Sequence, residues 1–209
     1  GDAELGFTRL SGNTDSQTLI GKTLLTWLTG NFTYSLRGEV RNVTKDDKTS
    51  AEQYLVAGRE RYELDGPHYL FGFARWEKDR FAGYDQQLSA IGGYGRQILE
   101  NDTHVFSLEA GPGYRHDRLR EHGDYRLAVA YTALDYQWFF SDYADIQQEM
   151  SFEYTDQNTT SRSLTALTAR LNSKLSLRLS HEIKHNSQPP DDTSERTDNT
   201  TSASLLYRW

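Results

Sequence analysis

The chain has 209 residues, of which 36% are hydrophobic and 25% are charged, and its formal net charge is −7. The acidic balance argues against a nucleic-acid partner, because nucleic-acid binding is driven by Lys and Arg side chains that neutralise phosphates. The chain contains no Cys, which excludes disulfide bonds and Cys-based metal sites.

Apolar and polar side chains alternate with a period of two along the whole chain, which predicts strands. No apolar run reaches the roughly 20 residues of a membrane helix, but a strand of a transmembrane barrel needs only about 9–11 residues and shows lipid alternate side chains. An early example at 32–41, FTYSLRGEVR, places apolar residues on one face and Arg37, Glu39 and Arg41 on the other. The segment LSLRLSHEIK at 175–184 repeats this pattern.

The predicted strands, about twelve in number, are separated by two alternating classes of connection. Short turns such as Thr29-Gly30-Asn31 and Asp65-Gly66-Pro67 alternate with longer polar loops such as SGNTDS at 11 and KDDKTS at 45. Periplasmic turns that are short and extracellular loops that are longer are typical of transmembrane barrels. We therefore predict that residues 1–209 form one all-β domain, an antiparallel outer-membrane barrel of about 12 strands with both termini on the turn side.

A water-soluble barrel or sandwich, with its apolar faces turned inward, is the alternative fold. The regular alternation of loop lengths weighs against it, because a soluble meander has no need of such a pattern. The sequence begins at Gly1 without a basic and apolar leader, so we expect any targeting segment to lie outside it.

Several motifs together resemble the family of salt-induced outer-membrane proteins (YdiY-like). They are YLFGFARWEKDRFAGYDQQLSAIGGYGRQIL from residue 69, LEAGPGYRHD after it, LSGNTDSQTL near the start and KHNSQPP near the end. The resemblance runs from about residue 3 to Trp209. It implies a bacterial outer-membrane location and a link to salt or osmotic stress, but it supplies no reaction and no set of functional residues.

The final predicted strand alternates apolar and polar residues and ends in the aromatic Trp209. It is similar to the C-terminal signal by which outer-membrane barrels are recognised for assembly. We therefore expect the barrel assembly machinery, outer-membrane lipid and lipopolysaccharide as partners, and we expect a monomer.

The stretch from residue 69 combines alternating aromatic residues with a run of charges. We predict that Tyr69, Phe71 and Phe73 face lipid and that the charges leave the bilayer at an outer loop, because a basic residue on the lipid face costs about 2–4 kcal/mol at mid-depth. Such a cluster either braces its own hairpin through salt bridges, the usual role of a charge run beside Gly, or binds a cation that bridges lipopolysaccharide phosphates. The predicted extracellular loop cluster comprises Trp76, Glu77, Lys78, Asp79, Arg80, Tyr84 and Asp85.

Charged residues on the polar faces of the strands are predicted to line the lumen. Charges of both signs can pair across a narrow barrel and close it, since buried charges must be paired, or they can line a water-filled path. Mixed signs argue against strong ion selectivity, because selective pores use rings of one sign. The predicted lumen residues are Arg37, Glu39, Arg41, Arg59, Arg61, Glu109, Arg126, Glu149, Arg178 and Glu182.

These observations favour a non-enzymatic role as a narrow pore or a structural barrel, without a cofactor, a metal ion or catalytic residues. The alternative is an outer-membrane hydrolase of lipid or lipopolysaccharide that uses His185 and Ser187, two residues apart on one strand face. Outer-membrane phospholipases place a His and a Ser at that spacing, and a base beside a hydroxyl is the minimum for nucleophilic catalysis. No orienting third group is identifiable. His181 and His185 cannot chelate one ion, because i and i+4 on a strand lie about 13 Å apart.

Overall fold

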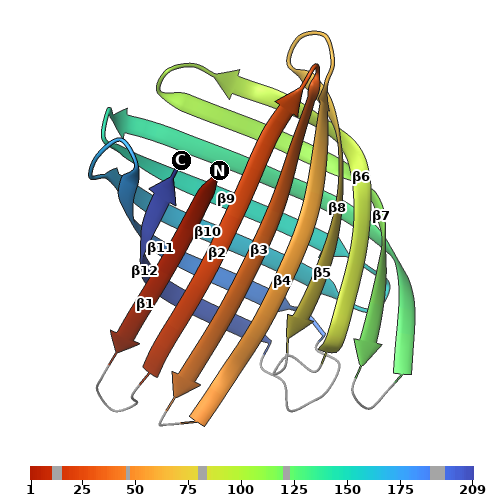
Figure 1. The fold of residues 1–209 in the computed structure, drawn as a ribbon. Coiled ribbons are helices and arrows are strands. Elements are labelled where there is room, and N and C mark those ends of the chain that lie inside the picture. Colours follow the sequence, from red (N-terminus) through yellow and green to blue (C-terminus); the bar gives the residue numbers. More distant parts are fainter. Residues whose placement is uncertain (11–15, 46–47, 80–83, 120–122, 189–195) are drawn as a thin grey trace.

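The computed structural model describes residues 1–10, 16–45, 48–79, 84–119, 123–188 and 196–209, and in this part of the chain twelve strands form a closed antiparallel barrel (Figure 1). Each strand pairs with its sequence neighbours, and β1 pairs with β12 to close the barrel. The predicted all-β barrel and its number of strands are therefore confirmed. The strands are β1 (Asp2–Leu10), β2 (Ser16–Thr29), β3 (Phe32–Lys45), β4 (Lys48–Glu63), β5 (His68–Asp79), β6 (Tyr84–Glu100), β7 (His104–Leu119), β8 (Gly123–Ser141), β9 (Ala144–Tyr154), β10 (Thr159–Arg170), β11 (Leu175–Asn186) and β12 (Thr197–Arg208).

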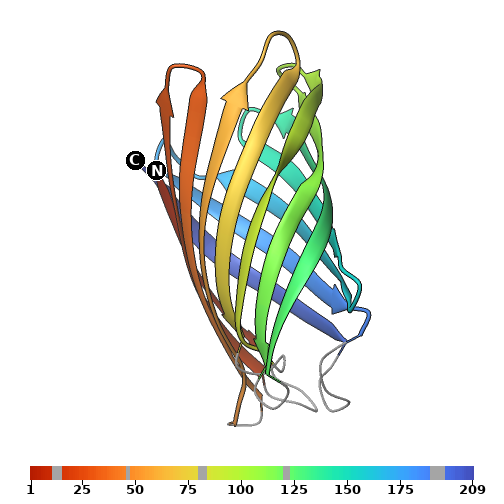
Figure 2. The same ribbon diagram turned by 90° about the vertical axis from the view of Figure 1, so that its right-hand side faces the viewer.

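Short turns join the strands at one end of the barrel, which we call the turn end; the opposite end is the loop end. The turns at the turn end occupy residues 30–31, 64–67, 101–103, 142–143 and 171–174. Both termini lie there too, and the Trp209 amide donates to the Gly1 carbonyl at 3.1 Å (Figure 2). β3 extends to Lys45 and β4 begins at Lys48, so the connection predicted at 45 is shorter than the sequence suggested.

The outer face of the barrel is apolar and its inner face is polar. Along β12 the outward Leu205 is 46% exposed, whereas its inward neighbour Ser204 is 3% exposed. Leu36, Leu88 and Leu179 are likewise exposed on other strands. A soluble barrel would bury these side chains, so the alternation suits a wall that contacts lipid. The described residues include no helix long and apolar enough to cross a membrane.

The orientation of β5 is opposite to the one predicted, so the prediction that Tyr69, Phe71 and Phe73 face lipid is wrong. Tyr69 is fully buried, and Phe71 and Phe73 pack with it in a hydrophobic cluster inside the barrel. Tyr69 is paired in register with Gly95 of β6, and a Cβ atom at Gly95 would overlap the Tyr69 ring. The missing side chain makes room for an inward aromatic ring, and the small or apolar residues between the aromatics face outward.

Candidate functional site

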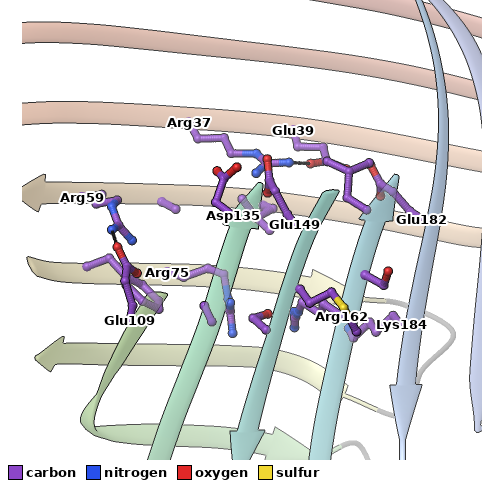
Figure 3. Close-up of a pocket in the computed structure, with 18 of the residues that line it drawn as sticks. Arg37, Glu39, Arg59, Arg75, Glu109, Asp135, Glu149, Arg162, Glu182 and Lys184 are labelled. Carbon is purple, nitrogen blue, oxygen red and sulfur yellow. Dashed lines mark hydrogen bonds and ion pairs between the residues drawn. The ribbon is translucent and has the colours of Figure 1, made fainter. Parts of the chain in front are cut away.

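The barrel encloses a cavity of about 530 Å³ that is lined mainly by charged side chains (Figure 3). Along β4 it extends from Gln53, near the loop end, to Arg61, near the turn end. Because successive residues of a strand point to opposite faces, alternate residues of β4 contribute to this lining, from Gln53 through Leu55, Ala57 and Arg59 to Arg61. Its charged members are Arg37, Glu39, Arg41, Arg59, Arg61, Arg75, Glu109, Asp135, Glu149, Arg162, Glu182 and Lys184.

Glu77 of β5 is the centre of an ion-pair network near the loop end. Its side chain is 1% exposed and accepts from Arg162 Nη2 at 2.8 Å, from Lys184 Nζ at 2.5 Å and from Gln53 Nε2 at 2.6 Å. These partners lie on β10, β11 and β4. Since β5 lies across the barrel from β10 and β11 in the strand order, the network bridges opposite walls of the lumen.

Arg75, two residues before Glu77, extends this network to β7 and β9. Its guanidinium lies 2.6 Å from the carboxylate of Glu153, which is also 3.8 Å from Arg115, and Arg115 in turn bonds Asp117 at 2.9 Å. Positive and negative side chains alternate along this network. Each buried charge therefore has a partner of opposite sign, as buried charges require. We call Gln53, Arg75, Glu77, Arg115, Asp117, Glu153, Arg162 and Lys184 the Glu77 network.

The Glu77 network lies in the loop-end part of the lumen. Glu77, Arg115, Asp117 and Glu153 are almost fully buried and do not line the cavity. Gln53, Arg75, Arg162 and Lys184 do line it. The cavity therefore lies on the turn-end side of a layer of paired charges.

A second group of ion pairs joins β2 and β3 to β11. Glu39 lies 3.1 Å from both Arg37 and Arg41. Glu182 of β11 pairs with Arg41 and with Lys22 of β2. Lys22 also approaches Glu39 at 3.9 Å, so two carboxylates share three cations.

A third group lies on β4, β5 and β7 and combines charges with aromatic rings. Arg59 pairs with Glu109, and the Tyr69 hydroxyl donates to the same carboxylate at 3.0 Å. The Arg61 guanidinium lies 3.6 Å from the centre of the Tyr69 ring, a cation–π contact. Arg59 lies 5.1 Å from the Phe71 ring centre. The inward aromatic residues of β5 thus hold two of the lumen arginines in place.

The structure places every predicted lumen residue on the inner face except Arg126. Arg126 is exposed on the outer face of β8, because the neighbouring Leu127 and Val129 are the buried residues of that strand. The prediction that Arg126 faces the lumen is therefore wrong, because successive residues of a strand point to opposite faces and Arg126 occupies an outward position. Arg178 also points into the barrel, but it does not line the cavity. It lies 3.6 Å from Glu4 of β1. Whether the inward residues control conductance stays a prediction.

The predicted extracellular loop cluster is not a loop cluster in the structure. Trp76, Glu77, Lys78 and Asp79 belong to β5, while Tyr84 and Asp85 begin β6. Arg80 lies outside the described residues. Glu77 and Asp79 are buried inside the barrel, whereas Lys78 is exposed. The reason is that β5 continues through the charge run, so alternate charges turn into the lumen and are compensated there.

The two residues of the alternative hydrolase site are engaged with other partners. His185 Nδ1 is 2.7 Å from Thr197 Oγ1. Ser187 Oγ donates to Asn158 Oδ1 at 3.2 Å and accepts from the Thr159 amide at 2.9 Å. Among the described residues no hydrogen bond joins His185 to Ser187, so the geometry does not assemble a base and a nucleophile.

Sequence reasoning missed several residues of the lumen, above all Arg75, Glu77 and Arg162. For β5 a signal was present, because Tyr69, Phe71, Phe73, Arg75 and Glu77 all have the same parity. A face that carries Arg75 and Glu77 within the bilayer has to point inward.

Several solved structures with similar folds are outer-membrane barrels. The chain is similar over its whole length to a structure titled NanC porin (TM-score 0.63, 9% identity, 99% of that chain). It is also similar to the KdgM porin in complex with disordered oligogalacturonate (TM-score 0.58, 11% identity, 99% of that chain) and to the translocator domain of the autotransporter NalP from Neisseria meningitidis (TM-score 0.55, 12% identity, 86% of that chain). At these identities the likeness shows the fold, which is that of an outer-membrane barrel.

Sequence comparison shows the family. The chain is 35% identical over 207 residues to the uncharacterized protein YdiY of Escherichia coli (strain K12), an alignment that covers 99% of this chain and 82% of YdiY. Together with the fold and the exposed apolar wall, this places the protein in the bacterial outer membrane. The model of the family described as "Protein of unknown function, DUF481" matches residues 3–209, and the chain belongs to that family.

Proposed function

We propose that the protein is a non-enzymatic, narrow pore of the outer membrane that is held closed near its loop end by the Glu77 network. The observation that carries this proposal is the position of Glu77. One buried carboxylate on β5 bonds cations from β10 and β11, on the opposite wall. Such a bridge blocks the lumen as long as its ion pairs are intact.

A pore is favoured over a purely structural barrel because charged groups on the turn-end side of the network still face open space. The Arg37 and Arg59 side chains are 40% and 32% exposed although both lie inside the barrel. A barrel with only a structural role would gain from apolar packing in their place, because buried ion pairs often contribute no net stability relative to well-packed apolar residues. The similarity of the fold to the KdgM and NanC porins supports the same choice.

The proposed closure also gives the barrel a physical link to salt stress, the role that the YdiY-like resemblance implied. Opening the network would expose its charges to water, where counterions gather around them and screen their mutual interactions. High ionic strength therefore stabilises the open state relative to the closed one. On this proposal the pore opens more often as external salt rises.

The partners that we propose are lipid, lipopolysaccharide and the barrel assembly machinery. The outward residues Leu205 and Tyr207 of β12 are exposed, and Trp209 stacks on Tyr207 with 6.0 Å between the ring centres. This leaves an apolar, aromatic strip available for recognition during assembly. The barrel closes by pairing β1 with β12, which suits the proposed monomer.

Single-channel recording in planar bilayers, at 0.1 M and about 1 M salt, tests the proposal. We expect rare, discrete steps from the wild-type protein, with an open probability that increases with salt more than that of a variant with a broken network. Silence from protein shown to be inserted, in both the wild-type form and the Glu77→Gln variant, would refute a pore and leave the structural barrel.

A further inference from the structure

The middle of the cavity contains two carboxylates side by side. Asp135 of β8 and Glu149 of β9 are direct partners in the strand register, and both line the cavity. Like charges directly opposite each other on neighbouring strands destabilise a sheet. A pair of this kind therefore needs a compensating cationic group.

Among the described residues the other cavity carboxylates form direct ion pairs with such a group, whereas Asp135 and Glu149 interact with Arg59 and Arg37 only at longer range. Glu39, Glu109 and Glu182 each form ion pairs with Arg or Lys. Within the described ranges no ion pair within 4.0 Å joins Asp135 or Glu149 to a basic side chain. Glu149 accepts a hydrogen bond from Gln147 Nε2 at 2.8 Å, and the Gln147 side chain also hydrogen-bonds Asp135. The two carboxylates thus retain acceptor capacity that is directed into the cavity.

The same cavity presents unused donors from β3 and β4. Arg37 and Arg59 are each bound to one carboxylate, Glu39 and Glu109, and a guanidinium has five N–H donors. Figure 3 shows Arg37 pointing toward Asp135 and Glu149, with Arg59 reaching into the cavity from the neighbouring strand. One cavity therefore contains two carboxylates that form no direct ion pair with a described residue, beside two guanidinium groups that have further N–H donors.

We propose that this cavity binds a small zwitterion, a solute with an ammonium group and a carboxylate group. The ammonium group lies between Asp135 and Glu149, and the carboxylate group accepts from Arg37 and Arg59. The inference deepens the proposed function, since the cavity is the interior of the proposed pore. The volume of about 530 Å³ falls in the range of small-molecule sites.

Simpler ligands fit this arrangement less well. A bare metal ion meets only two carboxylates, because the described residues contain no group of three or more His, Asp or Glu side chains placed to hold one, and the nearby arginines repel it. A simple anion gains the arginines but lies beside two carboxylates. Only a molecule with both charges satisfies both sides of the cavity.

Equilibrium dialysis of the folded full-length chain in detergent micelles tests the proposal with three radiolabelled probes. They are 4-aminobutyrate, butyrate, which lacks the ammonium group, and butylamine, which lacks the carboxylate group. We expect 4-aminobutyrate to bind at least tenfold more tightly than either of the others. We expect Asp135→Asn and Glu149→Gln each to weaken its binding at least tenfold.

Asp145→Asn is the matched control. Asp145 lies on β9 with Glu149, points inward and accepts from Gln137 at 3.0 Å, but it does not line the cavity, so this variant should bind like the wild type. The circular dichroism spectrum shows that each variant is folded, and removal of a like-charge pair should not destabilise the barrel.

Three outcomes would overturn the assignment. They are butylamine binding as tightly as 4-aminobutyrate, which would indicate a plain cation site; no binding of 4-aminobutyrate at millimolar concentration; and unchanged binding in both carboxylate variants. Dialysis does not depend on conduction. If no current is recorded but 4-aminobutyrate binds specifically, the proposed pore is rejected and the zwitterion site is retained. If discrete currents are recorded but 4-aminobutyrate does not bind, the zwitterion site is rejected and the pore is retained.

Discussion

Glu77 and Arg162 are 85 residues apart in the sequence, and their side chains meet inside the barrel with 2.8 Å between Oε2 and Nη2. β5 and β10, which carry them, are separated by four intervening strands in the shorter direction around the sheet. The contact therefore depends on closure of the barrel. It also brings buried ion pairs into the loop-end part of the lumen, a space that in a wide porin is filled with water.

The Glu77→Gln variant tests the closure most directly. Loss of the central charge leaves Arg75, Arg162 and Lys184 without their shared anion, and breaking a buried ion pair by removing one partner costs about 3–5 kcal/mol. We expect a free energy of unfolding lower by about this amount, measured in urea with the protein in micelles, and a higher open probability in planar bilayers.

Glu63→Gln is the control for this variant. Glu63 pairs with Arg61 at 2.5 Å on the same strand, and its side chain is 44% exposed, so its loss should change the free energy of unfolding by less than about 1 kcal/mol. Equal effects of the two substitutions would show that the Glu77 network does not stabilise the closed barrel.

The pair formed by Arg75 and Glu153 should be strongly coupled. The two side chains are buried and 2.6 Å apart, and residues in one ion-pair network show interaction energies of about 0.5–3 kcal/mol. A double-mutant cycle with Arg75→Met and Glu153→Gln, measured by urea unfolding, should give a value in the upper half of this range. The same cycle for Arg61 and Glu63 should give less than about 1 kcal/mol, and the reverse order would contradict the assignment of the buried network.

Gly95→Ala should destabilise the barrel although the change adds only one methyl group. The new Cβ atom would overlap the Tyr69 ring, and overpacking in a filled interior costs about 1–3 kcal/mol. Gly58→Ala is the matched control, because nothing lies within 4 Å of a Cβ atom there. Thermal unfolding followed by circular dichroism measures both. If Gly95→Ala is as stable as Gly58→Ala, Tyr69 does not face inward as the structure shows.

The sequence predicts the strands, their number and the two ends of the barrel because each of these features leaves a local signal. Period-two alternation marks the strands, and short turns mark the turn end. The face of β5 was predicted wrongly because the prediction relied on Tyr69 and Phe71, and aromatic residues suit both lipid and a packed lumen. The signal of direction lay in Arg75 and Glu77, which share that face. Arg126 was misplaced for a related reason, since one position of parity separates it from Leu127. The contact of Glu77 with Arg162 depends on the register of all the strands between them, which no local pattern contains.

Replacement of Arg37, Arg59 and Arg61 together by Ser should increase the single-channel conductance several-fold once the pore is open. These side chains line the cavity, and their removal widens it and leaves carboxylates as the dominant charges. For that reason the current should also become more selective for cations, as a reversal potential across a salt gradient will show. Arg126→Ser is the control, because Arg126 is exposed on the outer face and its loss should leave both quantities unchanged. If the triple variant conducts like the wild type, these arginines do not limit the path, and the restriction lies entirely in the Glu77 network.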